Sequence, residues 1–144
     1  MATAATRSGV RFAAEVTAGL IEMATARDAL ADALQECGWS REDTFRVLIC
    51  ADEAMANAVS HGSAPAGMID IRFRVSATAA AFVIGDHRSG VVESPQSDAL
   101  PADTCEHGRG VLLMRALADA FRMWRRSEGT MVALAFRTAE GSAR

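Results

Sequence analysis

The sequence predicts an α+β fold, a two-layer sandwich in which helices cover one face of a mixed, mostly antiparallel β-sheet. Three observations lead to this prediction. Apolar residues recur at helical spacing in some segments and alternate with polar residues in others. The predicted strands follow one another in adjacent runs, which favours antiparallel pairing. The 144 residues, half of them hydrophobic, suffice for one domain with a buried core.

The first part of the chain is expected to form an arm, a strand and a helix. Residues 1–9 are interpreted as a flexible arm, and residues 10–16 as an edge-type strand. A helix is predicted over residues 20–37, with Gly38 as its stop signal, because glycine readily adopts the conformation that ends helices. The single domain is expected to extend over residues 10–137.

A second helix is predicted to begin after Ser40 and to end near His61. Ser40 and Asp43 have the spacing of a capping box, with Asp in place of Glu. The apolar stripe of this helix is interpreted as a set of residues spaced at helical intervals. The set comprises Phe45, Leu48, Ile49, Ala56 and Val59.

The second part of the chain is expected to alternate between strands, a long loop and a helix. In residues 68–75, apolar residues alternate with Asp and Arg, which is typical of a strand with one buried face. Residues 91–107 form a loop with two prolines and four acidic residues, and a loop of this length is usually functional. The other expected elements are a strand at 79–86, a helix at 111–120, strands at 121–126 and 130–137, and a loose tail at 138–144.

Composition argues against several classes of protein. The net charge of −3 gives no electrostatic support for nucleic-acid binding. No apolar run approaches the ~20 residues that span a membrane. All 15 basic residues are arginine, so the phosphate-binding lysine of P-loop proteins and ordinary protein kinases is absent. Three cysteines without a close pair are interpreted as reduced thiols, which predicts a cytoplasmic protein.

Glu53 and Asn57 are the first candidate site residues. They are four residues apart in the second predicted helix and therefore share one face of it. A carboxylate and an amide oxygen suit a hard divalent cation whose shell is completed by phosphate and water. The carboxylate can alternatively deprotonate a hydroxyl nucleophile. The structural alternative is that both residues are solvated polar positions on an amphipathic helix.

Three further features have a functional and a structural interpretation. Asp86 ends a strand and can accept a hydrogen bond from an amine such as that of adenine, or can belong to a turn. The segment 108–110, Gly-Arg-Gly, precedes a predicted helix and can bind phosphate through its backbone N–H groups, or can be a hinge. Thr130 follows Gly129 in a predicted hairpin, which by itself indicates only a turn.

The order and spacing of these features resemble the GHKL ATPase and kinase superfamily. Residues 52–62 resemble its N box, residues 86–90 its first glycine box and residues 106–114 its second, while residues 129–130 match its closing Gly-Thr. Given the chain's size, the resemblance is to the anti-sigma-factor serine/threonine kinases of the switch-protein type. It covers residues 10–137.

This resemblance implies a Bergerat-type fold that holds Mg-ATP between helices and sheet, under a lid at residues 91–107. It also implies a role for each matching residue. The roles are general base or water-orienting carboxylate for Glu53, Mg²⁺ ligand for Asn57, adenine recognition for Asp86, support of the adenine end for Thr130, ATP binding for Gly90, and phosphate binding for Gly108, Arg109 and Gly110.

The partners implied by the resemblance are a STAS-type anti-anti-sigma protein, phosphorylated on Ser or Thr, a sequestered sigma factor and a second copy of the chain. Arg88 stands where the family has glycine, and His107 where it often has arginine. Arg88 motivates an alternative, a non-catalytic regulator-binding module with a degenerate or purely structural nucleotide site. A histidine-kinase catalytic domain is disfavoured, because no helix with a phosphoacceptor histidine precedes the predicted domain.

Overall fold

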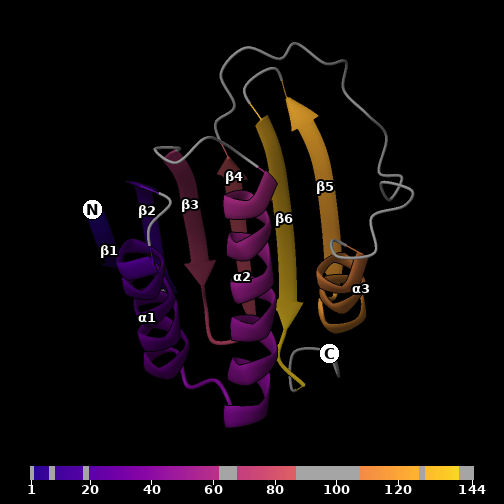
Figure 1. The fold of residues 1–144 in the computed structure, drawn as a ribbon. Helices are drawn as coiled ribbons and strands as arrows, with labels where there is room; N and C mark the ends of the chain where they lie inside the picture. The colour runs from indigo at the N-terminus through magenta and orange to yellow at the C-terminus, as the bar shows by residue number, and fades with distance from the viewer. Residues whose placement is uncertain are drawn as a thin grey trace.

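The computed structural model describes residues 2–6, 9–17, 20–61, 68–86, 108–126 and 129–139. The elements are β1 (Ala2–Thr6), β2 (Gly9–Thr17), α1 (Leu20–Glu36), α2 (Arg41–His61), β3 (Met68–Val75), β4 (Ala79–Asp86), α3 (Gly108–Leu117), β5 (Ala120–Arg126) and β6 (Gly129–Arg137). The described strands form one sheet, and the helices lie on one side of it (Figure 1). The α+β sandwich is therefore confirmed.

The sheet has the order β1-β2-β3-β4-β6-β5, and all its described neighbours are antiparallel. Ala2–Thr6 form β1 and pair with β2, whereas the sequence predicts a flexible arm there. As a result β2 lies inside the sheet, and β1 and β5 form its edges. The small residues of β1 show no periodicity, because its pairing uses backbone groups that any residue supplies.

The last strand of the chain lies inside the sheet. After β4 the chain forms α3, continues as the edge strand β5 and returns as β6, which pairs with both β4 and β5. α2 contacts β4 and β6, and α1 contacts β2 and β3. The end of β4 and the start of β6 are thereby brought together on the helix-covered face (Figure 1).

The core lies between this face and the helices. Phe12, Phe73, Phe82 and Leu134 form one row across β2, β3, β4 and β6. All four are buried, and the rings of Phe12 and Phe73 stack with centroids 4.8 Å apart. The regular alternation of buried residues along β3 and β6 agrees with a sheet that has one covered face.

The apolar stripe predicted for α2 is wrong in most of its members. Phe45 is 64% exposed and Val59 is 38% exposed. The side that packs on the core instead carries small residues together with a few larger ones. It comprises Val47, Leu48, Cys50, Ala51, Ala54, Met55 and Ala58. Alanines allow the helix backbone to approach the sheet closely, and this preference for small residues overrides residue size as a signal of burial.

The helix ends that join α1 to α2 follow the sequence prediction. Gly38 has a φ of 79°, and the N–H groups of Gly38 and Trp39 donate to the carbonyls of Gln35 and Leu34, each at 3.0 Å. This is a Schellman motif. The hydroxyl oxygen of Ser40 accepts the N–H of Asp43 at 3.1 Å and caps α2.

The third helix is displaced from its predicted position at residues 111–120. It begins at Gly108 and ends at Leu117, so residues 108–110 form its first turn. The first N–H groups of any helix have no acceptor within the helix, so glycine is tolerated there. The helix ends early because the N–H of Asp119 donates to the carbonyl of Ala135 and the chain enters the sheet.

Several predicted features lie outside the described residues. They are the lid at 91–107, Gly90, Arg88, His107 and the end of the tail after residue 139. Within the described part of the chain, no helix combines the length and the apolar character needed to cross a membrane.

Candidate functional site

The C-terminal half of α2 presents two polar side chains to the interior of the molecule. Glu53 and Asn57 are each partly buried and lie one turn apart on the same face of the helix. Within the described part of the chain, neither side chain has a hydrogen-bond or ion-pair partner. Their oxygen atoms can therefore interact with a ligand without breaking an existing contact.

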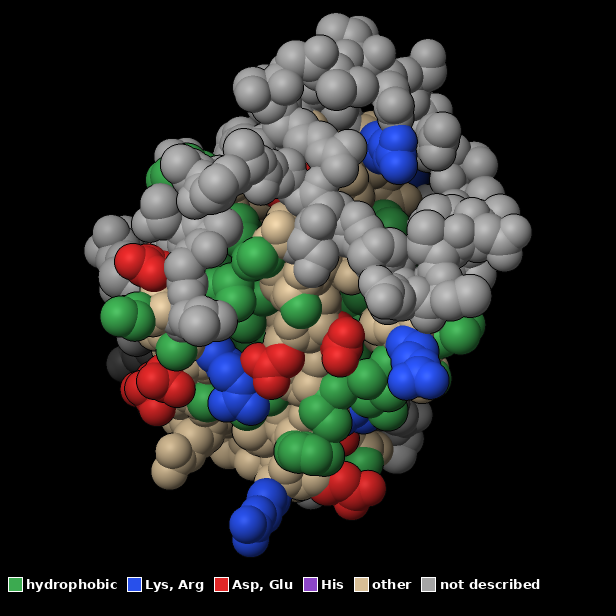
Figure 2. Space-filling view, viewed as in Figure 1, with side chains coloured by type: hydrophobic (Ala, Val, Ile, Leu, Met, Phe, Trp, Pro, Cys, Tyr) green, Lys and Arg blue, Asp and Glu red, His purple; other side chains and the backbone are tan. Residues whose placement is uncertain are grey.

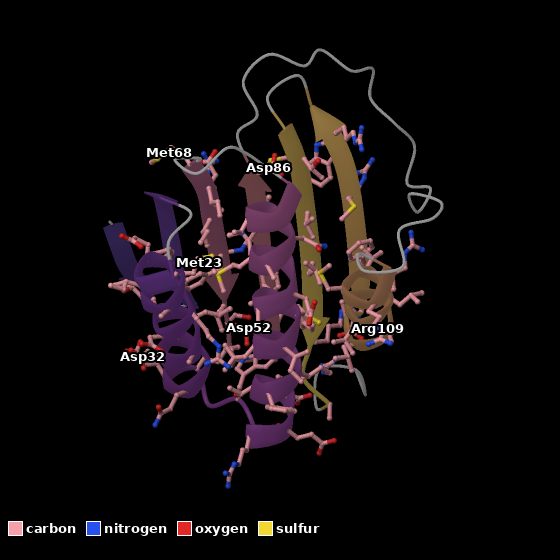
Figure 3. All side chains as sticks on the ribbon, viewed as in Figure 1. Met23, Asp32, Asp52, Met68, Asp86 and Arg109 are labelled. Atoms are coloured by element: carbon pink, nitrogen blue, oxygen red, sulfur yellow. The ribbon has the colours of Figure 1, made fainter. Side chains whose placement is uncertain are left out.

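Asp52 differs from its neighbour Glu53. The Asp52 carboxylate accepts two hydrogen bonds from Nε of Arg27 on α1, at 2.8 and 3.0 Å, and both side chains are well exposed. Figure 3 shows Asp52 in the space between α1 and α2. The interaction fastens one helix to the other, whereas Glu53 faces α3 on the other flank of α2.

Glu53 lies against the first turn of α3. A Cβ atom added to Gly110 would lie 2.6 Å from Oε2 of Glu53, closer than two such atoms can approach. Gly110 is buried, and its missing side chain leaves the space that the carboxylate occupies. The packing of α3 against α2 therefore brings two separately predicted site residues into contact.

Asp86 is held at the end of β4, on the helix-covered side of the sheet. It is only 5% exposed, and its Oδ1 accepts the backbone N–H of Thr130 at 2.7 Å. Gly129 has a φ of 143°, and any Cβ there would overlap the carboxylate and the carbonyl of Asp86. Glycine is thus required at 129 for two reasons, and the close approach orients a buried carboxylate.

The Gly-Arg-Gly segment at 108–110 is helical rather than a loop that precedes a helix. Its backbone N–H groups belong to the positive end of α3, which favours anions. Arg109 is exposed on this turn. Figure 3 shows Arg109 on α3, far along the molecule from Asp86, which lies beside the C-terminal end of α2.

The described candidate residues thus form two contacting groups connected by one face of α2. Glu53 and Gly110 make the first group, and Asp86 and Thr130 make the second. Asn57 follows Glu53 along α2, and Asp86 lies beside the C-terminal end of that helix (Figure 3). The structure therefore gives the predicted residues a common side of the sheet, although they come from four segments of the chain.

Sequence reasoning missed one residue at this end of the site. Arg125 lies directly across from Thr130 in the β5–β6 pair and is partly buried. Phe121 and Met123 precede it at alternate positions and face the helices. The alternation within β5 was the signal that could have placed Arg125 on the site's side of the sheet.

The described residues contain no cluster of three or more His, Cys, Asp or Glu side chains that could bind a metal ion. A divalent cation at Asn57 would therefore need most of its ligands from phosphate oxygens and water. Mg²⁺ is commonly bound in this way, through one or two protein oxygens together with substrate phosphates.

Comparison with known protein families identifies the same region. A family model described as histidine kinase-like ATPase domain matches residues 16–136. The match includes every candidate site residue, from Glu53 to Thr130. No curated protein matches the chain.

Proposed function

The chain belongs to the histidine kinase-like ATPase domain family, and on that premise we propose that it is an ATP-dependent protein serine/threonine kinase that also acts as an anti-sigma factor. Its proposed substrate is a Ser or Thr of a STAS-type anti-anti-sigma protein, and the protein that it is proposed to sequester is a sigma factor. One observation carries the catalytic part of this proposal. The Glu53 carboxylate is partly buried, lacks a partner among the described residues and lies against the first turn of α3.

ATP would lie along the face of α2 that joins the two groups of site residues. The Asp86 carboxylate accepts N–H donors, as its bond from Thr130 demonstrates, and would accept the adenine amine. The first turn of α3 and Arg109 would interact with the phosphates. Gly90 and the segment 91–107, which resemble the glycine box and lid of the family, would complete the site.

Asn57 would be the protein ligand of Mg²⁺. Its amide oxygen is a hard donor on the same helix face as Glu53, and it is not engaged by other described residues. When bound, the cation neutralises charge that develops on the phosphates during transfer. The chain has no lysine to neutralise this phosphate charge, so arginine side chains and backbone N–H groups would supply the rest of the positive charge beside the phosphates.

Glu53 would act as the general base. Its carboxylate oxygen would take the proton of the acceptor hydroxyl as the hydroxyl oxygen bonds to the γ-phosphorus. The bond from that phosphorus to the bridging oxygen breaks, and ADP leaves. Phosphoryl transfer depends mainly on position and charge stabilisation, so a partly buried carboxylate beside a helix N-terminus suits it.

The test is transfer of labelled γ-phosphate from Mg-ATP to a purified STAS-type protein. We expect Glu53→Gln to slow transfer about 10²–10⁴-fold, the scale of general-base catalysis, while nucleotide affinity stays near that of wild type. Asp52→Asn is the matched control and should leave transfer unchanged, because the Asp52 carboxylate pairs with Arg27 of α1 and not with α3.

Two outcomes would overturn the proposal. Wild-type protein that binds ATP but never phosphorylates the STAS-type protein would support the non-catalytic regulator-binding module instead. Transfer at the wild-type rate by Glu53→Gln would remove Glu53 from the chemistry.

A further inference from the structure

The face of the sheet opposite the described helices has an apolar centre. The outward positions of β4 and β6 alternate with the core residues and include no polar side chain between the strand ends. They are Ala81, Val83, Gly85, Met131, Ala133 and Ala135. An antiparallel sheet with one solvated face normally carries polar residues on that face. These two strands therefore resemble strands that are covered on both sides.

Charged residues border this apolar strip on both flanking strands. On β3 they are Arg72, Arg74 and, beside Gly85, the partly buried Asp70; on β5 the bordering charge is Arg122. In one cross-strand row, Arg72 of β3 is followed by Val83, Ala133 and Arg122 of β5. Arg74 lies beside Ala81 in the adjacent row. Arg72, Arg74 and Arg122 are all exposed.

The face is hollowed rather than flat. An open hollow of about 840 Å³ lies at one end of the strip, and its lining includes two arginines, Arg74 and Arg137, one acidic residue, Asp119, and the small Ala81 and Ala135. At the other end Trp124 of β5 pairs with Met131, and the guanidinium of Arg122 lies 5.9 Å from the Trp124 ring centroid. Apolar surface and cationic rim thus continue along the strands.

The width between the arginines of β3 and Arg122 of β5 selects the shape of an occupant. Three strand spacings of ~4.8 Å separate β3 from β5, which amounts to roughly 14 Å. An α-helix with its side chains is ~10–12 Å across, so it fills this strip and reaches the arginines on both of its sides. A single extended strand is too narrow to do so.

We propose that this face binds an α-helix of a partner protein, with small or apolar residues against β4 and β6 and Asp or Glu along both flanks. The charge of the rim determines the sign of the partner. A second copy bound face to face would place arginines against arginines, which is unfavourable. A nucleic acid could use only the bordering arginines, because the apolar centre offers no donors to its phosphates.

The inference does not depend on the proposed kinase activity. Glu53 and Asp86 face the helices, whereas the strip lies on the opposite side of the sheet, away from the viewer in Figures 1 and 2. A hydroxyl on a helix bound to the strip cannot reach Glu53. The partner at this face is accordingly one that is held rather than phosphorylated, and its binding should not require ATP.

The probe for this surface is a fluorescein-labelled synthetic helical peptide with an Ala-Leu stripe and glutamates on both flanks. The control peptide carries lysine at each glutamate position. In fluorescence anisotropy we expect full-length protein to bind the acidic peptide at least tenfold more tightly than the basic one, about 1.4 kcal/mol, with or without Mg-ATP. Raising the salt concentration should weaken the binding.

Substitutions then locate the binding. Arg72→Glu combined with Arg122→Glu should reverse the preference between the two peptides. Ala133→Glu should weaken binding of the acidic peptide by introducing a like charge at the centre of the strip. Arg41→Glu, an exposed substitution at the start of α2, is the matched control and should bind as wild type does.

The proposal is overturned if wild type binds neither peptide, binds both equally, or binds the acidic one unchanged by these substitutions. It is also overturned if sedimentation shows a self-association that Ala133→Glu abolishes, or if duplex RNA displaces the acidic peptide. Circular dichroism and ATP affinity verify that each variant is folded.

Discussion

Two pairs of polar residues on α2 differ in their hydrogen-bond partners. In the N-terminal half, Asp43 and Arg46 form hydrogen bonds to other parts of the chain. In the C-terminal half, Glu53 and Asn57 have no such partner among the described residues. All four residues are partly buried, so exposure does not separate the two pairs. The two pairs therefore differ in their engagement with the rest of the fold rather than in burial, and the unengaged pair is the one proposed to bind a ligand.

Arg46 connects α2 to the ends of α3 and β6. Its guanidinium donates to the carbonyls of Leu117 at 2.9 Å and Arg137 at 2.7 Å, which are the ends of α3 and β6. It also pairs with Asp43 at 3.2 Å and lies 5.5 Å from the ring centroid of Phe136. A single cation thereby joins α2 to the last residues of two other elements.

Substitution of Arg46 is expected to have the largest effect on stability. Arg46→Ala leaves two carbonyls without their donor and removes a cation from beside Phe136, so we expect it to lower the free energy of unfolding by about 2–4 kcal/mol. Urea unfolding measures this loss, and Arg41→Ala, at an exposed position of the same helix, is the control. An effect below about 0.5 kcal/mol would contradict the structural role of the N-terminal half.

The complementary change is Asn57→Ala. We expect it to weaken Mg-ATP binding about 10–100-fold in calorimetry, because a metal ligand is lost, while the free energy of unfolding without nucleotide stays within about 0.5 kcal/mol. Removal of Mg²⁺ should weaken ATP binding by the wild type and abolish most of the difference in affinity between the wild type and Asn57→Ala. A loss of stability without a loss of affinity would place Asn57 with the structural residues.

Gly110→Ala sharpens the comparison, because its expected effects on stability and activity have opposite signs. Alanine favours a helix over glycine by roughly 0.5–1 kcal/mol, so the melting temperature should stay the same or rise. The new Cβ displaces the Glu53 carboxylate, so phosphotransfer should fall about tenfold, equivalent to roughly 1.4 kcal/mol in the barrier. Thermal unfolding and the transfer assay measure the two effects. Transfer at the wild-type rate would show that the position of Glu53 against α3 is unimportant.

The smallest expected effect concerns Cys50, which lies between the two halves. Burial raises the pKa of its thiol from 9.0 to about 11; the nearby Glu53 charge adds to this, and Arg46 opposes it. Unfolded chains therefore lose this proton at lower pH than folded ones. The contribution to stability is complete below about pH 9 and is lost as the pH rises to about 11.

The measurement is urea unfolding of wild type and Cys50→Ala between pH 8 and about 11. We expect wild type to lose stability relative to the variant as the pH rises through this window. A constant difference between the two proteins would contradict the raised pKa.

Local patterns were sufficient for many elements and candidate residues. The alternation at 68–75 predicted β3 within its observed bounds, and Gly38 and Ser40 marked the junction of α1 and α2. The four-residue spacing of Glu53 and Asn57 placed them on one helix face. These features depend on contacts between residues close in sequence, which a pattern can record.

Features that depend on distant contacts were missed or misplaced. β1 exists through pairing with β2, and α3 ends where Asp119 donates to β6. The buried side of α2 is set by the closeness of the sheet, which favours alanines over the larger Phe45 and Val59. The periodicity of their own segments shows neither the pairing of β1 nor the end of α3, and in α2 apolar residues occur on both the buried and the exposed side.

The sequence alone indicated most element types, the candidate residues and, through their order, the family, because helical and strand periods and short motifs are local properties. Only the tertiary structure decided which polar residues are engaged. It placed Gly110 against Glu53, Gly129 against Asp86, and arginines on either side of an apolar strip. The physical reason is that strand register and helix packing bring together residues that are far apart in the chain.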